Sequence, residues 1–142
     1  MSNKSLNEII DRLSLAKLSN SELLNIDIFE DDGSVACITV PDREEFPIYL
    51  TVDEGQILVI TYLFADDQVN KEQRADLTEA MLILNVSIPL SAFSKISNQY
   101  IMFGALSPQS STDDLIQEIE TLSDNVLEAI DAVSEYLTNP GE

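Results

Sequence analysis

Histidine and tryptophan are absent from the 142-residue sequence, and cysteine occurs once. Without histidine, the chain cannot build a Ser-His-Asp or Cys-His catalytic arrangement, and it lacks the commonest general base. Cys37 alone cannot form an intrachain disulfide. It lies in the alternating stretch SVACITV, which predicts a buried and unreactive thiol, because no helix terminus or cluster of bases adjoins it.

Cations are scarce. Seven lysines and arginines accompany 26 aspartates and glutamates, which gives a formal net charge of −19. Such a surface repels nucleic acid and attracts basic partners, although the same charge also serves plain solubility. The basic residues are too few to form a groove, so we expect no direct binding of nucleic acid.

Long hydrophobic runs are missing as well. No apolar stretch reaches the length that spans a bilayer, and the first ten residues, MSNKSLNEII, lack the hydrophobic segment of a secretory signal. We therefore expect no integral membrane segment and a cytoplasmic location, which agrees with the single cysteine.

Glycine is sparse, and its four copies are scattered, so no Gly-rich phosphate loop exists. Neighbouring carboxylates occur at residues 30–33, 53–55 and 66–67. Each place has the composition of a turn, and none has the spacing of an EF-hand loop. We expect no catalytic residue, cofactor or metal site. An enzyme that uses these carboxylates with a metal or a nucleotide is the alternative.

Four strands are predicted in the first half of the chain. Apolar residues at helical spacing first indicate a helix over residues 5–18, with Ser5 as its N-cap. Two hairpins follow, with turns at Asp32-Gly33 and at residues 53–55. Residues 58–60 are apolar at every position, which predicts a central strand covered on both faces.

The second half of the chain predicts a helix, a hairpin and a longer helix. Asn70 is the expected N-cap of the helix that must end before Pro89, and residues 91–106 alternate as a third hairpin. We therefore predict one α+β domain over residues 1–142. It is built on a single antiparallel sheet of five to six strands in the order α-ββββ-α-ββ-α.

Residues 111–137 form the predicted C-terminal helix, and they contain no lysine, arginine or histidine. One face is an apolar stripe, and the charged residues, which are all acidic, lie mostly off this stripe. The stripe either packs on the sheet or contacts another chain in part, with the acids selecting a basic partner. The residues predicted to bind that partner are Glu118, Leu122, Asp124, Val126, Glu128, Ile130, Asp131, Val133 and Glu135.

Two stretches carry a family resemblance. Residues 85–93 (NVSIPLSAF) and 100–107 (YIMFGALS), together with the acidic C-terminal helix, resemble the YjfI-like family of bacterial proteins, a domain of unknown function. The resemblance implies a cytoplasmic protein encoded beside relatives of phage-shock protein A, a coiled-coil protein that remodels membranes. The order of elements is also similar to that of type III secretion chaperones, which are dimers that bind extended client segments.

Three functional hypotheses remain open at this point. The first is a non-enzymatic, acidic adaptor or chaperone-like protein that is expected to form a homodimer. It would bind a basic or helical protein segment, such as one of a phage-shock-protein-A-like partner. The second is the carboxylate-based enzyme. The third is an acidic protein that inhibits a nucleic-acid enzyme by mimicking nucleic acid. We favour the first, because the catalytic residue types are missing and the last helix carries acids alone.

Overall fold

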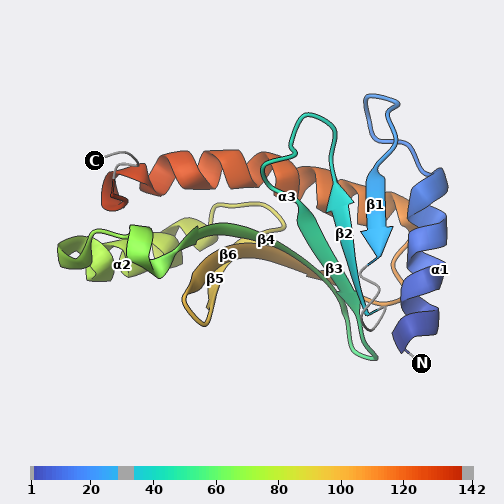
Figure 1. The fold of residues 1–142 in the computed structure, drawn as a ribbon, viewed down its shortest axis with the longest axis horizontal. Helices are drawn as coiled ribbons and strands as arrows, with labels where there is room; N and C mark the ends of the chain where they lie inside the picture. The colour runs from blue at the N-terminus through green and yellow to red at the C-terminus, as the bar shows by residue number, and fades with distance from the viewer. Residues whose placement is uncertain (1, 29–33, 139–142) are drawn as a thin grey trace.

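The computed structural model describes residues 2–28 and 34–138, the side chains of residues 2–5 excepted. Six strands form one antiparallel sheet in the spatial order β1-β2-β3-β4-β6-β5 (Figure 1). The helices are α1 (Ser2–Leu15), α2 (Arg74–Asn85) and α3 (Thr112–Val133). The strands are β1 (Asn25–Ile28), β2 (Val35–Thr39), β3 (Ile48–Val52), β4 (Ile57–Ala65), β5 (Ala92–Ile96) and β6 (Gln99–Leu106).

The predicted fold class is confirmed: the order of elements is α-ββββ-α-ββ-α on one antiparallel sheet. The second and third hairpins pair as β3 with β4 and β5 with β6. β1 and β2 also pair, but the Asp32-Gly33 turn lies outside the described residues. Strand β6 pairs with β5 on one side and with β4, which is not its neighbour in sequence, on the other, and this order leaves β5 and β1 as the two sheet edges.

The first helix differs from its prediction at both ends. It begins at Ser2, so Ser5 lies inside the helix and is not its N-cap. It ends at Leu15. In the loop that follows, Ser21 has a φ of 72°, and the N–H of Leu18 donates a hydrogen bond to the carbonyl of Glu22. Leu18 therefore enters the core from a loop instead of from the helix.

The second helix begins as predicted at Asn70, whose side chain accepts a hydrogen bond from the N–H of Glu72. The first turn is a 3₁₀ turn over Lys71–Gln73, and α2 continues to Asn85, four residues before Pro89. The side chain of Asn85 then holds the start of β5, because its amide oxygen accepts from the N–H of Phe93 at 2.7 Å. This contact fixes how α2 meets the sheet edge.

The third helix lies along one side of the sheet and reaches from α1 at one end of the molecule to α2 at the other (Figure 1). Ser111 is its N-cap, and its side chain accepts a hydrogen bond from the N–H of Asp114. The helix ends at Val133 and not at residue 137. A 3₁₀ turn over Ser134–Tyr136 follows, because Leu137 bridges to Val69 and the carbonyl of Tyr136 accepts from Asn70.

One hydrophobic cluster joins all three helices to the same side of the sheet. Leu13 of α1, Leu50 of β3, Met102 of β6 and Leu122 of α3 are fully buried in it, and α2 contributes Leu77. Strands β2, β3 and the first part of β4 alternate between buried and half-buried positions, which places every second side chain on the opposite side. That second side of the sheet receives no helix from the described part of the chain.

Candidate functional site

The apolar stripe of α3 packs against the sheet in the protein's own core. Three of the residues predicted to bind a partner, Leu122, Val126 and Val133, have no exposed surface, and Ile130 packs against the same cluster. In this fold these four residues stabilise the monomer. The stripe therefore serves the first of the two roles that the sequence left open.

Glu118 is the one predicted partner-binding acid that does not face solvent. Its side chain is 5% exposed, and the burial raises the pKa of its carboxyl. Its Oε2 atom has no hydrogen-bond partner among the described residues. Glu118 is thus an exception to the expectation that the acids lie mostly off the stripe. The helical period predicts it, because Glu118 is three residues after Leu115 and four before Leu122, both fully buried.

Gly104 makes room for this carboxyl group. A β-carbon at Gly104 would overlap Oε2 of Glu118 and would lie 2.9 Å from its Cδ and 3.1 Å from the carbonyl oxygen of Leu90. At this glycine, both α3 and the loop before β5 approach strand β6 closely. The family-like stretches at residues 85–93 and 100–107 thus meet at one structural contact.

The other four predicted acids, Asp124, Glu128, Asp131 and Glu135, are exposed on α3. They succeed one another at spacings of three or four residues, so they follow one side of the helix. Asp124 lies 3.5 Å from a guanidinium nitrogen of Arg43. Among the described residues, the other three have no ion-pair partner, and the last turn of α3 contains no basic residue.

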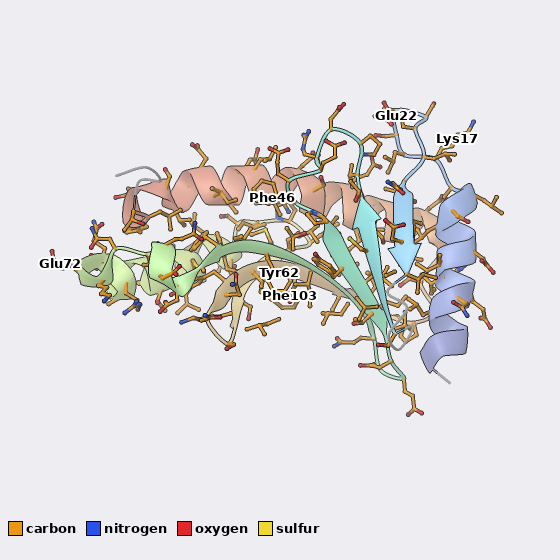
Figure 2. The ribbon with its side chains drawn as sticks, viewed as in Figure 1. Lys17, Glu22, Phe46, Tyr62, Glu72 and Phe103 are labelled. Carbon is orange, nitrogen blue, oxygen red and sulfur yellow. The ribbon has the colours of Figure 1, made fainter. Side chains whose placement is uncertain are left out.

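The side of the sheet away from the helices is mostly apolar, and we call it the open face. Its apolar side chains alternate with the core residues along four strands. They are Val35, Cys37, Tyr49, Leu58, Ile60, Tyr62, Ile101 and Phe103. Figure 2 shows Tyr62 and Phe103 on the side of the β4 and β6 ribbons away from α3. Strand β4 is central in the sheet, as predicted, but the described helices cover only one of its two faces, so the prediction of a strand covered on both faces is wrong.

The register aligns these side chains into a row across the sheet. Asp27 pairs with Cys37, Cys37 with Tyr49 and Tyr49 with Ile60, and the row continues through Phe103 to Ala92. Asp27, on edge strand β1, is the one charged residue among the strand residues that the structure places on this side. An antiparallel sheet normally exposes a polar face to water, so an apolar one indicates a binding surface.

Aromatic side chains stabilise the centre of the open face. The rings of Tyr49 and Tyr62 meet edge to face with their centroids 5.6 Å apart, and Tyr62 remains 44% exposed. Burial raises the pKa of the Tyr49 hydroxyl, and the neighbouring Cys37 and Tyr62 raise it further. Ile101 pairs with Tyr62 and is buried, yet it does not belong to the core cluster. The open face thus has a small apolar layer of its own.

Cys37 lies in this row and is half-buried, not fully buried as predicted. Burial raises the pKa of its thiol, and the charge of Asp27 on the neighbouring strand raises it further. Both effects disfavour the thiolate, so the expectation of an unreactive cysteine agrees with its surroundings.

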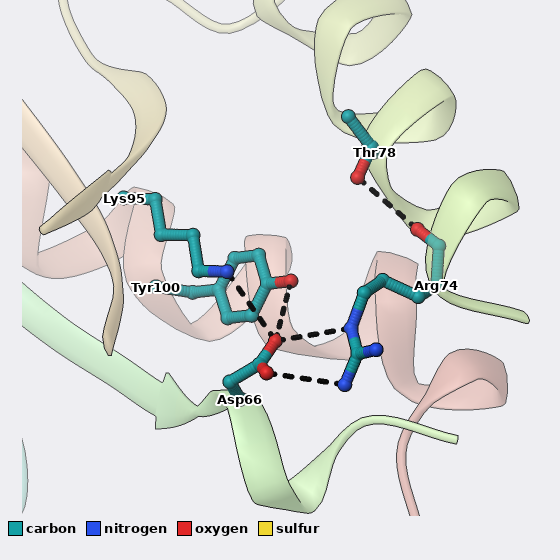
Figure 3. A network of polar contacts seen from close by, with 5 residues as sticks. All are labelled: Asp66, Arg74, Thr78, Lys95 and Tyr100. Atoms are coloured by element: carbon teal, nitrogen blue, oxygen red, sulfur yellow. Dashed lines mark hydrogen bonds and ion pairs between the residues drawn. The ribbon is translucent and has the colours of Figure 1, made fainter. Parts of the chain in front are cut away.

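A polar network holds the start of α2 against β5 and β6 (Figure 3). Asp66 receives two hydrogen bonds from Arg74, at 3.2 and 3.1 Å, one from Tyr100 at 3.1 Å and one from Lys95 at 3.4 Å. Burial alone would raise the pKa of Asp66, but the bonds from Tyr100 and Lys95 and the charges of Arg74 and Lys95 together lower it. Lys95 also lies 4.8 Å above the Tyr100 ring.

The turn carboxylates have structural roles where the structure describes them. Asp53 accepts hydrogen bonds from the N–H groups of Gly55 and Gln56, which closes the turn between β3 and β4. Asp66 is the centre of the α2 network, and residues 30–33 lie outside the described residues. Within residues 2–28 and 34–138, no three histidine, cysteine, aspartate or glutamate side chains gather to hold a metal ion.

None of the helices in the described part of the chain is long and apolar enough to cross a bilayer.

Solved structures of similar fold include protein complexes. The chain is similar to a chain of the HopA1-SchA chaperone–effector complex, with a TM-score of 0.59 and 17% identity over 95% of this chain and 97% of that one. It matches Escherichia coli YbjN with the same TM-score, 15% identity and coverage of 96% and 95%. A third match is a chain of the ExoU-SpcU complex of the Pseudomonas aeruginosa type III secretion system, with a TM-score of 0.51, 11% identity and coverage of 95% and 99%.

At these identities the structural matches show the fold alone, and they confirm the plan expected from the order of elements. Sequence comparison shows more. The chain is 30% identical to the uncharacterised protein YjfI of Escherichia coli K12 over 117 residues, which are 79% of this chain and 85% of YjfI. Residues 3–137 match the model of the family DUF2170, described as uncharacterised proteins conserved in bacteria. The chain therefore belongs to the DUF2170 family, as its resemblance to YjfI-like proteins indicated.

Proposed function

We propose that this protein is a non-enzymatic, chaperone-like adaptor of the cytoplasm that binds a segment of another protein. The observation that carries the proposal is the open face, a mostly apolar sheet surface with one charged residue among its described strand positions, in a chain of net charge −19. Solved complexes of the same fold, among them a chaperone with its effector, support a protein as the ligand.

The partner is proposed to carry a basic or helical segment. The support comes from α3, where Asp124, Glu128, Asp131 and Glu135 form an exposed acidic line along one side of the helix. A cationic segment that lies along this line gains from Glu128, Asp131 and Glu135, which have no counter-ion among the described residues. The family resemblance makes a coiled-coil protein similar to phage-shock protein A the first candidate partner.

The protein is further proposed to be a homodimer. Helix α2 exposes an aliphatic ridge, with Leu82 and Ile83 each 66% exposed and Val86 91% exposed. These side chains are one, three or four residues apart, so they form one surface. A second copy is the fitting occupant, because an uncharged aliphatic ridge is complementary to itself across a two-fold axis.

Site-specific crosslinking tests the open face. A photo-reactive amino acid placed at Tyr62 should form a covalent adduct with the co-expressed coiled-coil candidate, and mass spectrometry should locate its attachment in a defined segment. The same group at Glu72, exposed at the far end of the molecule from the open face (Figure 2), is the control and should give no such adduct.

Two exposed apolar side chains separate binding from dimerisation. Tyr62→Ser should weaken capture of the partner by at least about tenfold, the size expected for a central aromatic contact, and should leave the oligomeric mass unchanged. Leu82→Ser should lower the mass in sedimentation and leave capture unchanged. Equal capture by both variants would remove the open face as the binding site, and a monomeric wild-type mass would remove the dimer.

A further inference from the structure

A polar cavity lies where two loops meet α3. It is open to solvent on one side and has a volume of about 230 Å³. Its lining comes from residues 18–20 after α1, from residues 40–43 between β2 and β3, and from Glu120, Ser123 and Asp124 of α3. The loops are held in place by hydrogen bonds: the backbone N–H and the hydroxyl of Ser19 both donate to Oε2 of Glu120, at 3.2 and 2.8 Å. The cavity is therefore part of the fold, lined from three separate segments.

Two hydrogen-bonding groups at this cavity are buried without a partner. Ser123 is 3% exposed, and its hydroxyl makes no hydrogen bond to any described residue. The same holds for Nε of Arg43, which has no accessible surface although the guanidinium end lies near Asp124. Buried polar groups are normally paired, so an occupant with an acceptor atom is expected between them.

The charges on the cavity wall select the occupant further. Asp42, Glu120 and Asp124 contribute three carboxylates, and Arg43 contributes the one cation among the lining residues. Asp124 partly neutralises Arg43 at 3.5 Å, and Oε1 of Glu120 remains available, since Ser19 uses only Oε2. A cationic group would pair with the carboxylates, and an acceptor atom beside it would receive hydrogen bonds from Arg43 and Ser123.

The cavity also lies on the acidic line of α3. Glu120 precedes Asp124 by four residues, and Asp124 precedes Glu128 by four, so the wall carboxylates and the exposed acids follow the same side of the helix. A basic segment lying along that line has one side chain above the cavity.

We propose that the cavity receives a lysine or arginine side chain of the bound segment. The cationic end meets Glu120 and Asp124, and a backbone carbonyl of the same segment accepts hydrogen bonds from the Ser123 hydroxyl and from Nε of Arg43. The inference deepens the proposed function, on which it rests for the presence of a basic partner segment. It assigns one anchoring pocket to the partner's charge in place of a diffuse attraction.

The test uses two capped tripeptides, acetyl-Gly-Lys-Gly-amide and its norleucine counterpart, with the full-length protein. Nuclear magnetic resonance reports the occupant directly, because the arginine Nε–H and the backbone amides of residues 19 and 123 give separate signals. The lysine peptide should shift the signals of Arg43 and Ser123 in a saturable way, and the norleucine peptide should leave them unchanged. The proposed pocket would be overturned if the signals of Arg43 and Ser123 stayed unchanged at peptide concentrations that saturate the shifts of other residues.

Matched variants distinguish the pocket from general electrostatics. Glu120→Gln removes one charge but keeps an acceptor for Ser19, and it should weaken the lysine peptide about tenfold, as expected for a lost charged hydrogen bond. Asp131→Asn removes one charge from the same helix outside the cavity lining and should change affinity less than about twofold. Equal effects of the two variants would overturn the inference.

Ser123→Ala gives a second readout. It should weaken the peptide while raising the thermal midpoint, because it removes a hydroxyl that the folded protein leaves unpaired. A lower midpoint would show that the hydroxyl serves the fold and would count against the pocket. The crosslink from Tyr62 is independent of these results. If the lysine peptide binds but the crosslink is absent, the proposed function is refuted and the pocket is not. If the crosslink forms but the lysine peptide does not bind, the pocket alone is refuted.

Discussion

Replacing Gly104 by alanine tests the contact between β6 and α3 that joins the two family-like stretches. The new methyl group would overlap Oε2 of Glu118 and approach the backbone oxygen of Leu90 to 3.1 Å. Glu118 is 5% exposed, so its carboxyl has no free space into which to withdraw. We expect Gly104→Ala to lower the free energy of unfolding by about 1–3 kcal/mol, the range for overpacked cores.

The sign of this effect separates packing from chain entropy. Where a glycine holds an ordinary backbone conformation and has space, alanine stabilises by about 0.4–1 kcal/mol through the unfolded state. Gly104 does not adopt the left-handed backbone conformation, so that gain is available once the overlap is removed. In the background of Glu118→Ala, which deletes the carboxyl, Gly104→Ala should therefore be neutral or slightly stabilising.

The assay is a double-mutant cycle measured by urea unfolding, followed by circular dichroism at neutral pH. The expected coupling between the two positions is about 1–3 kcal/mol, above the roughly 0.3–0.5 kcal/mol within which independent sites add. Equal destabilisation by Gly104→Ala in both backgrounds would refute the reasoning. It would show that the glycine is needed for the approach of Leu90 and not for Glu118.

Three further outcomes follow from the same structure. Leu122→Ala should lower the free energy of unfolding, measured in urea, by about 2–5 kcal/mol. Leu127→Ala, at a side chain 41% exposed on the same helix, should lower it far less. Equal losses would contradict the packing of α3. Ser111→Ala should cost about 1 kcal/mol through loss of the N-cap, and Ser111→Asp should restore it. Asp66→Asn should destabilise the protein at neutral pH. Because the folded state lowers the pKa of Asp66, its contribution is present above the ordinary value of 3.8 and is lost as the pH falls, so wild type and variant should converge in acid.

Glu118 has the opposite pH dependence from Asp66. Burial raises the pKa of its carboxyl above the ordinary value of 4.5, so the folded state binds this proton more tightly than the unfolded chain does. The stabilising effect is complete below that ordinary value and is lost as the pH rises through the folded-state pKa. Glu118→Gln should therefore be more stable than wild type at neutral pH, with a gap that narrows on mild acidification. A constant gap in urea midpoints would contradict a buried ionisable Glu118.

Periodicity explains which parts of the fold were predictable. The core stripe of α3 repeats at helical spacing, and the hairpin strands alternate around turn residues, so local sequence determines both. The pairing of β4 with β6 depends on contacts about 40 residues apart, for which neither pattern carries information. The same reason hides the partners of Asp66, because Tyr100 is 34 residues away in sequence.

The open face was not predicted from the sequence, because the usual interpretation of consecutive apolar residues does not hold for β4. Consecutive apolar residues in β4 normally indicate a strand buried on both faces. Here Leu58 and Ile60 are half-buried on a side without helices, and Ile60 belongs to the row that runs from Cys37 to Phe103. The sequence records that these positions are apolar. It does not record that the three helices all pack on the other side of the sheet, and that asymmetry is what makes this surface available.

The acidic residues at the two ends of α3 differ in whether the fold accounts for their charge. At the N-terminal end the fold accounts for the charges, because Asp113 and Asp114 lie at the favourable end of the helix dipole and Glu120 binds Ser19. Toward the C-terminal end, Glu128, Asp131 and Glu135 oppose the dipole and repel one another at spacings of three and four residues. No described cation offsets these three charges. Under the proposed function, a basic segment would therefore gain charge pairing at this end of α3, in addition to the proposed contact with Glu120 and Asp124.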